Sequence, residues 1–202
     1  MLICPNALLG AQLIPSYNAI LLGQNGSFSY QSGIIPKHIA YWKLLKNEII
    51  STQSFLLTEL GRLVSEEGLS DFQRRLRACV LTYTKGTTFS EPADRLVYTC
   101  SSLESLLLKD SSEPIQQNLG ERMAFLITED PTGRADIVGS VRQAYGMRSR
   151  YIHHRNAEIE ESTLNAFTVY AFSTLLMALS SMDKFKSAVE FIDSIDRIKF
   201  GG

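Results

Sequence analysis

The sequence has little cysteine and no excess of either charge. Its 202 residues contain three cysteines, which stand far apart and form no metal-ligand pattern. Such sparse cysteine is typical of a reducing compartment, so we predict a cytoplasmic protein. The formal net charge is -1 at pH 7, with 20 basic and 21 acidic residues. This balance excludes a general polyanion-binding surface, so any contact with nucleic acid must come from a local patch.

Charge is missing altogether from residues 1–36, and Lys37 is the first basic side chain. Without a basic leader, this apolar segment does not match a signal peptide. Long hydrophobic runs are also missing, because the longest one, residues 166–179, is too short and too rich in hydroxyls to span a bilayer. We therefore expect no contact with a membrane, and we predict that residues 163–180 form the most buried helix.

The sequence also lacks the motifs that hold cofactors. It contains no glycine-rich phosphate loop, and its cysteines do not have the spacing of a zinc site. We therefore expect no metal ion and no cofactor, which leaves any chemistry to the side chains of the chain itself.

From about residue 37 onward, apolar residues recur at intervals of three and four, the periodicity of amphipathic helices. Ser70 with Asp71 has the pattern of an N-cap, Gly86 that of a helix stop, and Pro92 that of a first-turn proline. Another helix is expected to begin near Pro131. Further helices are expected over 113–128 and within 158–199.

Prolines and a glycine-containing turn at 23–27 break residues 1–36 into short pieces, which leaves room for short strands. We expect this uncharged segment to pack against the helices or to be covered by a partner. The sequence therefore predicts an all-α helical bundle with an irregular N-terminal element. The element comprises residues 1–66, partly helical from about 37, and the helical domain comprises residues 67–202.

One short stretch concentrates cations. Residues 145–155, YGMRSRYIHHR, contain three arginines and two of the three histidines, with no acid among them. On a helix, Arg148 falls into an apolar stripe. The stripe consists of Ile137, Val141, Ala144, Tyr145 and Ile152. Burying an arginine costs on the order of several kcal/mol unless hydrogen-bond acceptors compensate its charge.

Glu104 is the candidate partner of Arg148. It lies beside the apolar stripe of the helix expected over 90–110, where a carboxylate can hold a guanidinium with bidentate geometry. In the alternative interpretation both side chains lie at a solvated rim and never meet. His153 is about 140° from Arg148 around an ideal helix, so the two converge only if the helix bends, the arginine reaches round, or two chains form the site. A lone histidine at a helix end otherwise compensates the helix dipole, as Arg150 and Arg155 also would.

Three segments together resemble the HEPN domains, particularly their Apea-like branch. The stretch YGMRSRYIHH resembles the signature in which an aromatic residue and a short spacer precede Arg-Ser, two apolar residues and His. DRLVYTCSSLESLLL resembles the family's helix with a glutamate in a leucine-rich run, and NLGERMAFLI resembles its next helix, which carries an internal arginine. The resemblance covers roughly residues 70–182 and implies an HEPN-like helical bundle.

HEPN domains are usually dimers, and many are metal-independent ribonucleases that use the RNA 2′-hydroxyl as nucleophile. The resemblance implies Arg148 and His153 as catalytic residues, with Ser149 and Glu104 in support and Arg122 in a structural role. Ser149 departs from the Asn or Asp common elsewhere in the superfamily, although serine fits this branch. The remaining cations of the cluster are expected to bind RNA. These are Arg142, Arg150, His154 and Arg155.

Many family members act as toxins or in anti-phage defence. The expected partners are therefore RNA, a second copy of the chain, and an antitoxin or sensor protein. Two other interpretations stay open. One is a catalytically silent HEPN module that serves dimerisation within a larger complex, against which the presence of both Arg148 and His153 counts. The other is a plain helical interaction domain, which leaves the arginine in the apolar stripe unexplained.

Overall fold

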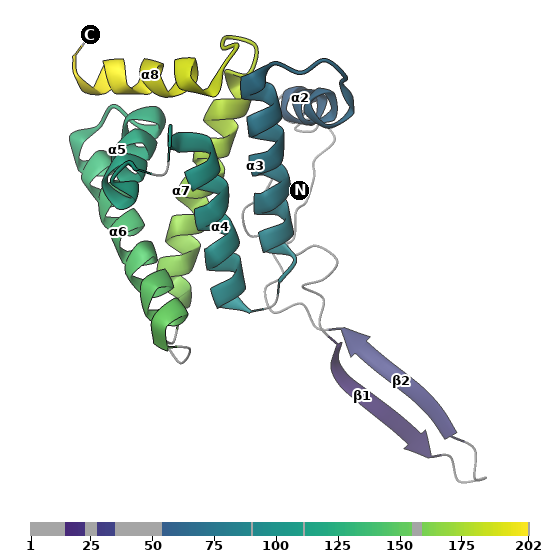
Figure 1. Cartoon of the computed structure of the whole chain (residues 1–202). Helices are drawn as coiled ribbons and strands as arrows, with labels where there is room; N and C mark the ends of the chain where they lie inside the picture. The colour runs from purple at the N-terminus through teal and green to yellow at the C-terminus, as the bar shows by residue number, and fades with distance from the viewer. Residues whose placement is uncertain are drawn as a thin grey trace.

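The computed structural model describes residues 15–22, 28–34, 54–89, 91–110, 112–154 and 159–201 (Figure 1). From residue 54 onward, every regular element among them is a helix. The helices are α2 (Ser54–Ser65), α3 (Asp71–Thr87), α4 (Pro92–Leu107), α5 (Ile115–Ile127), α6 (Pro131–His154), α7 (Glu161–Ser180) and α8 (Ala188–Lys199). The prediction of an all-α helical bundle is confirmed.

The bundle is built from antiparallel neighbours. Helix α3 packs along α4, and α5 packs along α6, while α7 lies against both pairs (Figure 1). Helix α8 crosses one end of the bundle and covers α5 and α3. Short connections between consecutive helices favour this antiparallel packing. The C-terminal end of α6, which carries the cation cluster, lies at the opposite end from α8.

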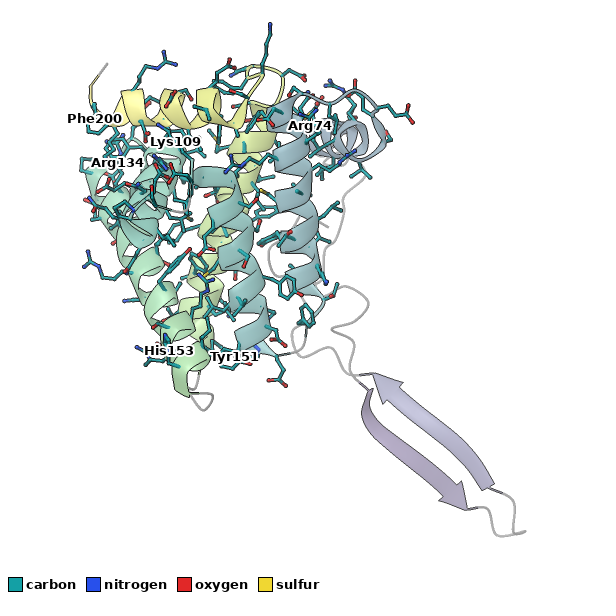
Figure 2. The ribbon with its side chains drawn as sticks, viewed as in Figure 1. Arg74, Lys109, Arg134, Tyr151, His153 and Phe200 are labelled. Carbon is teal, nitrogen blue, oxygen red and sulfur yellow. The ribbon has the colours of Figure 1, made fainter. Side chains whose placement is uncertain are left out.

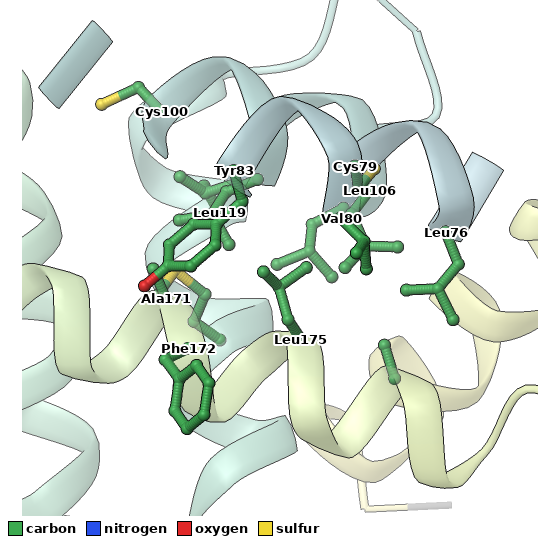
Figure 3. Close-up of a cluster of buried hydrophobic side chains, with 14 of the residues drawn as sticks. Leu76, Cys79, Val80, Tyr83, Cys100, Leu106, Leu119, Ala171, Phe172 and Leu175 are labelled. Atoms are coloured by element: carbon green, nitrogen blue, oxygen red, sulfur yellow. The ribbon is translucent and has the colours of Figure 1, made fainter. Parts of the chain in front are cut away.

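The core is a continuous cluster of apolar side chains drawn from all of these helices. Figure 3 shows the part of it that includes side chains of α3, α4, α5 and α7. Its largest fully buried members include aromatic residues of α3, α7 and α8. They are Phe72, Tyr83, Phe167 and Phe191. The Phe72 and Phe191 rings stack with centroids 4.6 Å apart, which joins α3 to α8. Aromatic pairs of this kind contribute about 0.5–1.5 kcal/mol beyond the burial of their area.

The prediction that residues 163–180 form the most buried helix is wrong. Eight of the sixteen residues of α4 are buried, against eight of the twenty of α7. The reason is position, since α4 lies between α3, α5, α6 and α7, whereas one side of α7 is open. Val169 and Met177 of α7 are 41% and 42% exposed. By length and composition alone α7 could cross a membrane, a test that the core helix of a bundle also passes.

Three predicted helix starts are confirmed, and one of them is Pro131, where α6 begins. Ser70 caps α3, because its hydroxyl accepts a hydrogen bond from the Gln73 backbone while the Gln73 side chain accepts one from the Ser70 backbone. This reciprocal capping box satisfies two otherwise unpaired N–H groups. Helix α4 begins at Pro92, whose missing N–H costs nothing in a first turn.

Gly86 does not stop α3, contrary to the prediction. The helix continues to Thr87, and Gly86 is buried within it. A Cβ atom at this position would lie 2.8 Å from Cβ of Tyr98. Glycine is therefore present because the last turn of α3 approaches α4 closely, and not because the chain turns there.

Replacing Gly86 with alanine is expected to lower the free energy of unfolding by about 1–2 kcal/mol. The added methyl group forces α3 and α4 apart, and this outweighs the better helix propensity of alanine. The matched control is Gly61→Ala in α2, where a Cβ atom would meet nothing within 4 Å. The control should be neutral or stabilising by up to about 1 kcal/mol. Urea denaturation of both variants measures the difference, and equal changes would contradict a close α3–α4 contact.

The N-terminal part contains one β-hairpin. Strands β1 (Pro15–Leu22) and β2 (Phe28–Ile34) pair antiparallel in register from Leu22 opposite Phe28 to Tyr17 opposite Gly33. The register shifts between Pro15 and Tyr17. Short strands were compatible with the sequence of residues 1–36. The helix expected from about residue 37 lies outside the described residues as far as residue 53.

Helix α2 belongs to the packed bundle although it precedes residue 67. Leu63 is fully buried, and Arg62 forms ion pairs with Glu59 and Asp183 at 2.7 and 3.0 Å. Asp183 follows α7, so this contact ties α2 to a segment far along the sequence. The structure therefore joins the last part of the N-terminal element to the helical domain.

Arg122 of α5 is the most completely bonded side chain of the bundle interior. Its Nε and Nη2 donate to Asp196 at 2.9 and 3.0 Å, and its Nη1 and Nη2 donate to Glu113 at 2.8 and 2.9 Å. Nη1 also donates to the Leu107 carbonyl oxygen at 2.7 Å, at the end of α4. All the N–H groups of this guanidinium are thus used. The arginine, 4% exposed, joins α4, α5 and α8.

Candidate functional site

The cation-rich end of α6 faces α4 through an ion pair. Nη1 of Arg148 contacts Oε1 of Glu104, its candidate partner in the sequence. The side chains are 23% and 21% exposed, so the pair is half-buried. The structure thus combines both interpretations: the two residues meet, and they do so at the rim of the core.

Tyr145 also contacts Glu104, and the sequence did not indicate this third member. Its hydroxyl donates to the same Glu104 Oε1 at 2.6 Å, and the Arg148 guanidinium lies 5.5 Å from the centre of its ring. Burial, together with the neighbouring Cys100 and Glu104, raises the pKa of the Tyr145 hydroxyl, which keeps it a donor. Tyr145 was assigned to the apolar stripe. The sequence signal that could have indicated its contact with Glu104 is its position one turn before Arg148 on the same side of α6.

The apolar stripe of α6 ends differently from the prediction. Ile137, Val141 and Ala144 are buried, but Ile152 is 54% exposed. Met147, 3% exposed, continues the buried face in its place. The contact face of α6 therefore turns toward Met147, which leaves Arg148 beside the core and not inside it.

Arg148 uses few of its hydrogen-bond donors, in contrast to Arg122. Nη1 contacts Glu104, while the buried Nε has no hydrogen-bond partner and Nη2 has none among the described residues. Burial on its own lowers the pKa of Arg148, but the charge of Glu104 outweighs it, so the pKa is raised. Arg148 is therefore a permanently charged guanidinium, oriented by one carboxylate and with donors to spare.

Cys100 lies beneath this pair but cannot act as a nucleophile in this state. It is fully buried in α4, and burial raises the pKa of its thiol to about 12. The nucleophilic form of cysteine is the thiolate, which such a pKa suppresses at neutral pH. The reactive candidates at this end of the bundle are therefore the cations of α6.

The structure does not bring His153 into contact with Arg148. His153 is exposed near the C-terminal end of α6 (Figure 2) and has no hydrogen bond or ion pair within the described part of the chain. Ser149, Arg142 and Arg150 are exposed as well. The side chain of His154 and all of Arg155 lie outside the described residues.

Arg150 lies back along α6. A Cβ atom on Gly146 would be 3.6 Å from Nη1 of Arg150, so the guanidinium rests over the bare backbone of the preceding turn. No ion pair joins Arg150 or Arg142 to any residue that the structure describes. These two cations therefore add unpaired positive charge to the exposed surface of α6.

The chain was compared with known proteins, and no match was found among family models, curated proteins or solved structures. Within the described ranges, no group of three or more His, Cys, Asp or Glu side chains could hold a metal ion. The assignment of a function consequently depends on the geometry of the α6 cluster and on its resemblance to HEPN domains.

Glu104→Ala is expected to lower the free energy of unfolding by about 1–3 kcal/mol. The substitution leaves the Arg148 guanidinium and the Tyr145 hydroxyl without their shared acceptor in a half-buried position. Glu104→Gln should cost less, since its amide oxygen still accepts a hydrogen bond. Thermal and urea unfolding of both variants test this, and an alanine variant as stable as the parent would mean that water replaces the carboxylate.

Proposed function

We propose that the protein is a metal-independent endoribonuclease of HEPN type. The RNA 2′-hydroxyl attacks the adjacent phosphorus, the bond from phosphorus to the 5′-oxygen breaks, and the products are a 2′,3′-cyclic phosphate and a 5′-hydroxyl. Arg148 and His153 are the proposed catalytic residues, with Glu104 and Ser149 in support.

The observation that carries the proposal is the state of Arg148. Nη2 of Arg148 makes no hydrogen bond to a described residue and is not among the buried atoms, so this guanidinium, held by Glu104 through Nη1, can bind a phosphate oxygen through Nη2. Charge builds on the phosphate oxygens as the 2′-oxygen attacks, and a preorganised cation stabilises that charge. Burial of the pair strengthens this effect, because half-buried charges are screened less than exposed ones.

Histidine supplies the proton transfers. One imidazole accepts the proton of the 2′-hydroxyl, and an imidazolium gives a proton to the departing 5′-oxygen. One chain offers a single His153, which is exposed and makes no hydrogen bond to a described residue. We propose that a two-fold dimer places two copies of Arg148 and His153 in one cleft, because an isologous interface brings equivalent residues together.

The resemblance also supports a biological role. We propose a toxin or anti-phage effector in the cytoplasm, which acts on RNA as a homodimer and is controlled by an antitoxin or a sensor protein. Arg142, Arg150, His154 and Arg155 are the proposed RNA contacts beyond the reacting phosphate. Among the described residues no ion pair involves Arg142 or Arg150, so their charges contribute to the local patch that a nearly neutral chain needs to bind a polyanion.

Purified protein is expected to cleave mixed RNA in the presence of a chelator. The products should carry 2′,3′-cyclic phosphate ends, and DNA of the same sequence should stay intact because it lacks the attacking hydroxyl. Gel analysis and mass spectrometry of the ends measure both outcomes. Cleavage that requires an added divalent ion, or that yields 3′-hydroxyl ends, would contradict the mechanism.

A catalytically silent dimerisation module is the second candidate. It is favoured by the missing contact between Arg148 and His153 within the described chain. Under this alternative the parent protein forms dimers but leaves RNA intact at every concentration tested.

A further inference from the structure

A groove runs between α5 and α6 on the outer surface of the bundle. Two adjoining hollows of about 530 and 380 Å³ form it, and both are lined by Glu121, Val138 and Arg142. Binding sites for small molecules typically have volumes of about 300–1,000 Å³. Ile115 and Phe125 add further apolar area, so the groove has an apolar floor with polar side chains at its edge.

The uncompensated charge of the groove is positive. Glu121 contacts Lys199 and accepts a hydrogen bond from Gln117 at 3.1 Å, so its carboxylate is already neutralised. Arg142 is exposed without an ion pair to a described residue, and Arg134 lies 4.0 Å from the centre of the Phe125 ring. A ligand with an apolar face and an anionic group matches this arrangement.

The groove is aligned with His153 along α6. Ser149 and His153 follow Arg142 by seven and eleven positions, which places each of them within about 20° of Arg142 around the helix. All three are exposed, and the Arg150 guanidinium lies over Gly146 between them. Arg142 and His153 are about 16 Å apart along the axis at the standard rise. This exposed strip of α6 carries cations and no acid.

We propose that the α5–α6 groove binds a nucleotide of single-stranded RNA a few positions away from the bond that is cleaved. The base lies on the apolar floor beside Ile115 and Val138, and Arg142 binds its phosphate. Gln116 at the edge offers an amide that can hydrogen-bond a base. The inference rests on the proposed ribonuclease function, and it identifies single-stranded RNA that extends beyond the cleaved dinucleotide as the substrate.

The test uses Ile115→Glu, which places an acid in the groove. Ile115 is the first residue of α5 and is 38% exposed, and an acid in a first turn is compatible with the helix dipole. The matched control is Val189→Glu in the first turn of α8, where valine is 48% exposed. Affinity for a fluorescent 2′-O-methyl hexanucleotide, which cannot be cleaved, is measured by anisotropy. Cleavage of a dinucleotide and of a hexanucleotide is measured alongside.

Ile115→Glu should weaken hexanucleotide binding by about tenfold, since the acid repels the strand, while Val189→Glu leaves it unchanged. Ile115→Glu should slow cleavage of the hexanucleotide but not of the dinucleotide, which does not reach the groove. Equal binding by the two variants, or no binding by the parent, overturns the groove assignment even if RNA is cleaved. A parent that cleaves no RNA but shows the predicted difference in binding overturns the ribonuclease function and leaves the groove as an RNA site.

Discussion

Replacing His153 with alanine is expected to reduce RNA cleavage by about 10²–10⁴-fold, the usual contribution of a positioned acid or base. The side chain is exposed and makes no hydrogen bond or ion pair with a described residue, so the fold should be unaffected. The neighbouring His154 is the natural control, because consecutive residues are about 100° apart around a helix. His154→Ala should retain substantial activity.

Arg148→Ala should be similarly inactive, and Arg148→Lys should not rescue it. An ammonium group keeps the charge but cannot contact Glu104 and a phosphate oxygen with the same planar set of donors. Removal of one preorganised charge-stabilising group typically costs about 10²–10³-fold in rate. Initial rates on a defined RNA in chelator measure each variant, with thermal melts to show that it is folded. Full activity of His153→Ala would refute the assignment and favour the silent dimerisation module.

Much of the helical architecture could be predicted from local signals. Ser70 and Pro92 marked helix starts correctly, because caps and first-turn prolines act through backbone groups only a few residues away. Gly86 was misread for the same reason. Its sequence context fits a helix stop, whereas its packing against Tyr98 depends on how α3 and α4 approach each other, which no local pattern contains.

The same contrast between local signals and packing between helices applies to the candidate site. Glu104 could be named as the candidate partner of Arg148, since Arg148 falls into one apolar stripe, Glu104 lies beside another, and the two charges are complementary. The hydrogen bond from the Tyr145 hydroxyl to the same carboxylate could not be predicted, because an aromatic residue in an apolar stripe is usually part of the core. The α5–α6 groove was also missed. It depends on the space between two helices and on the neutralisation of Glu121 by Lys199, a residue far along the sequence.

Arg122 shows most clearly how an interaction can depend on residues far apart in the sequence. The resemblance implied a structural role for Arg122, but nothing in the sequence indicated Glu113 and Asp196 as its partners. Asp196 is 74 positions away and reaches Arg122 only because α8 folds across the end of α5. Lys109 adds a further contact to Asp196 at 3.2 Å. The ends of α4, α5 and α8 therefore meet at one network of charges.

Replacing Arg122 with methionine is expected to lower the free energy of unfolding by about 3–5 kcal/mol, the cost of removing one partner from a buried ion pair. The substitution leaves two carboxylates facing each other without their shared cation, and it frees the Leu107 carbonyl oxygen. The matched control is Arg62→Met. Arg62 pairs with three carboxylates, those of Glu59, Glu66 and Asp183, but its side chain is 39% exposed, so solvent screens these pairs and the loss of Arg62 should cost far less than the loss of Arg122.

The pH dependence distinguishes this network from simple packing. Hydrogen bonds from Arg122 lower the pKa of Glu113, and for Asp196 the bonds from Arg122 and Lys109 outweigh the burial that would raise its pKa. A carboxyl with a lowered folded-state pKa stabilises the protein above its unfolded pKa of about 4, and that stability is lost as the pH falls through the folded pKa. The difference between the parent and Arg122→Met should therefore be largest near neutral pH and shrink below about pH 4, as urea unfolding at a series of pH values would show. A difference that stays constant into acid would mean that Arg122 stabilises the bundle through the packing of its side chain, and that the two carboxylates contribute nothing through their charge.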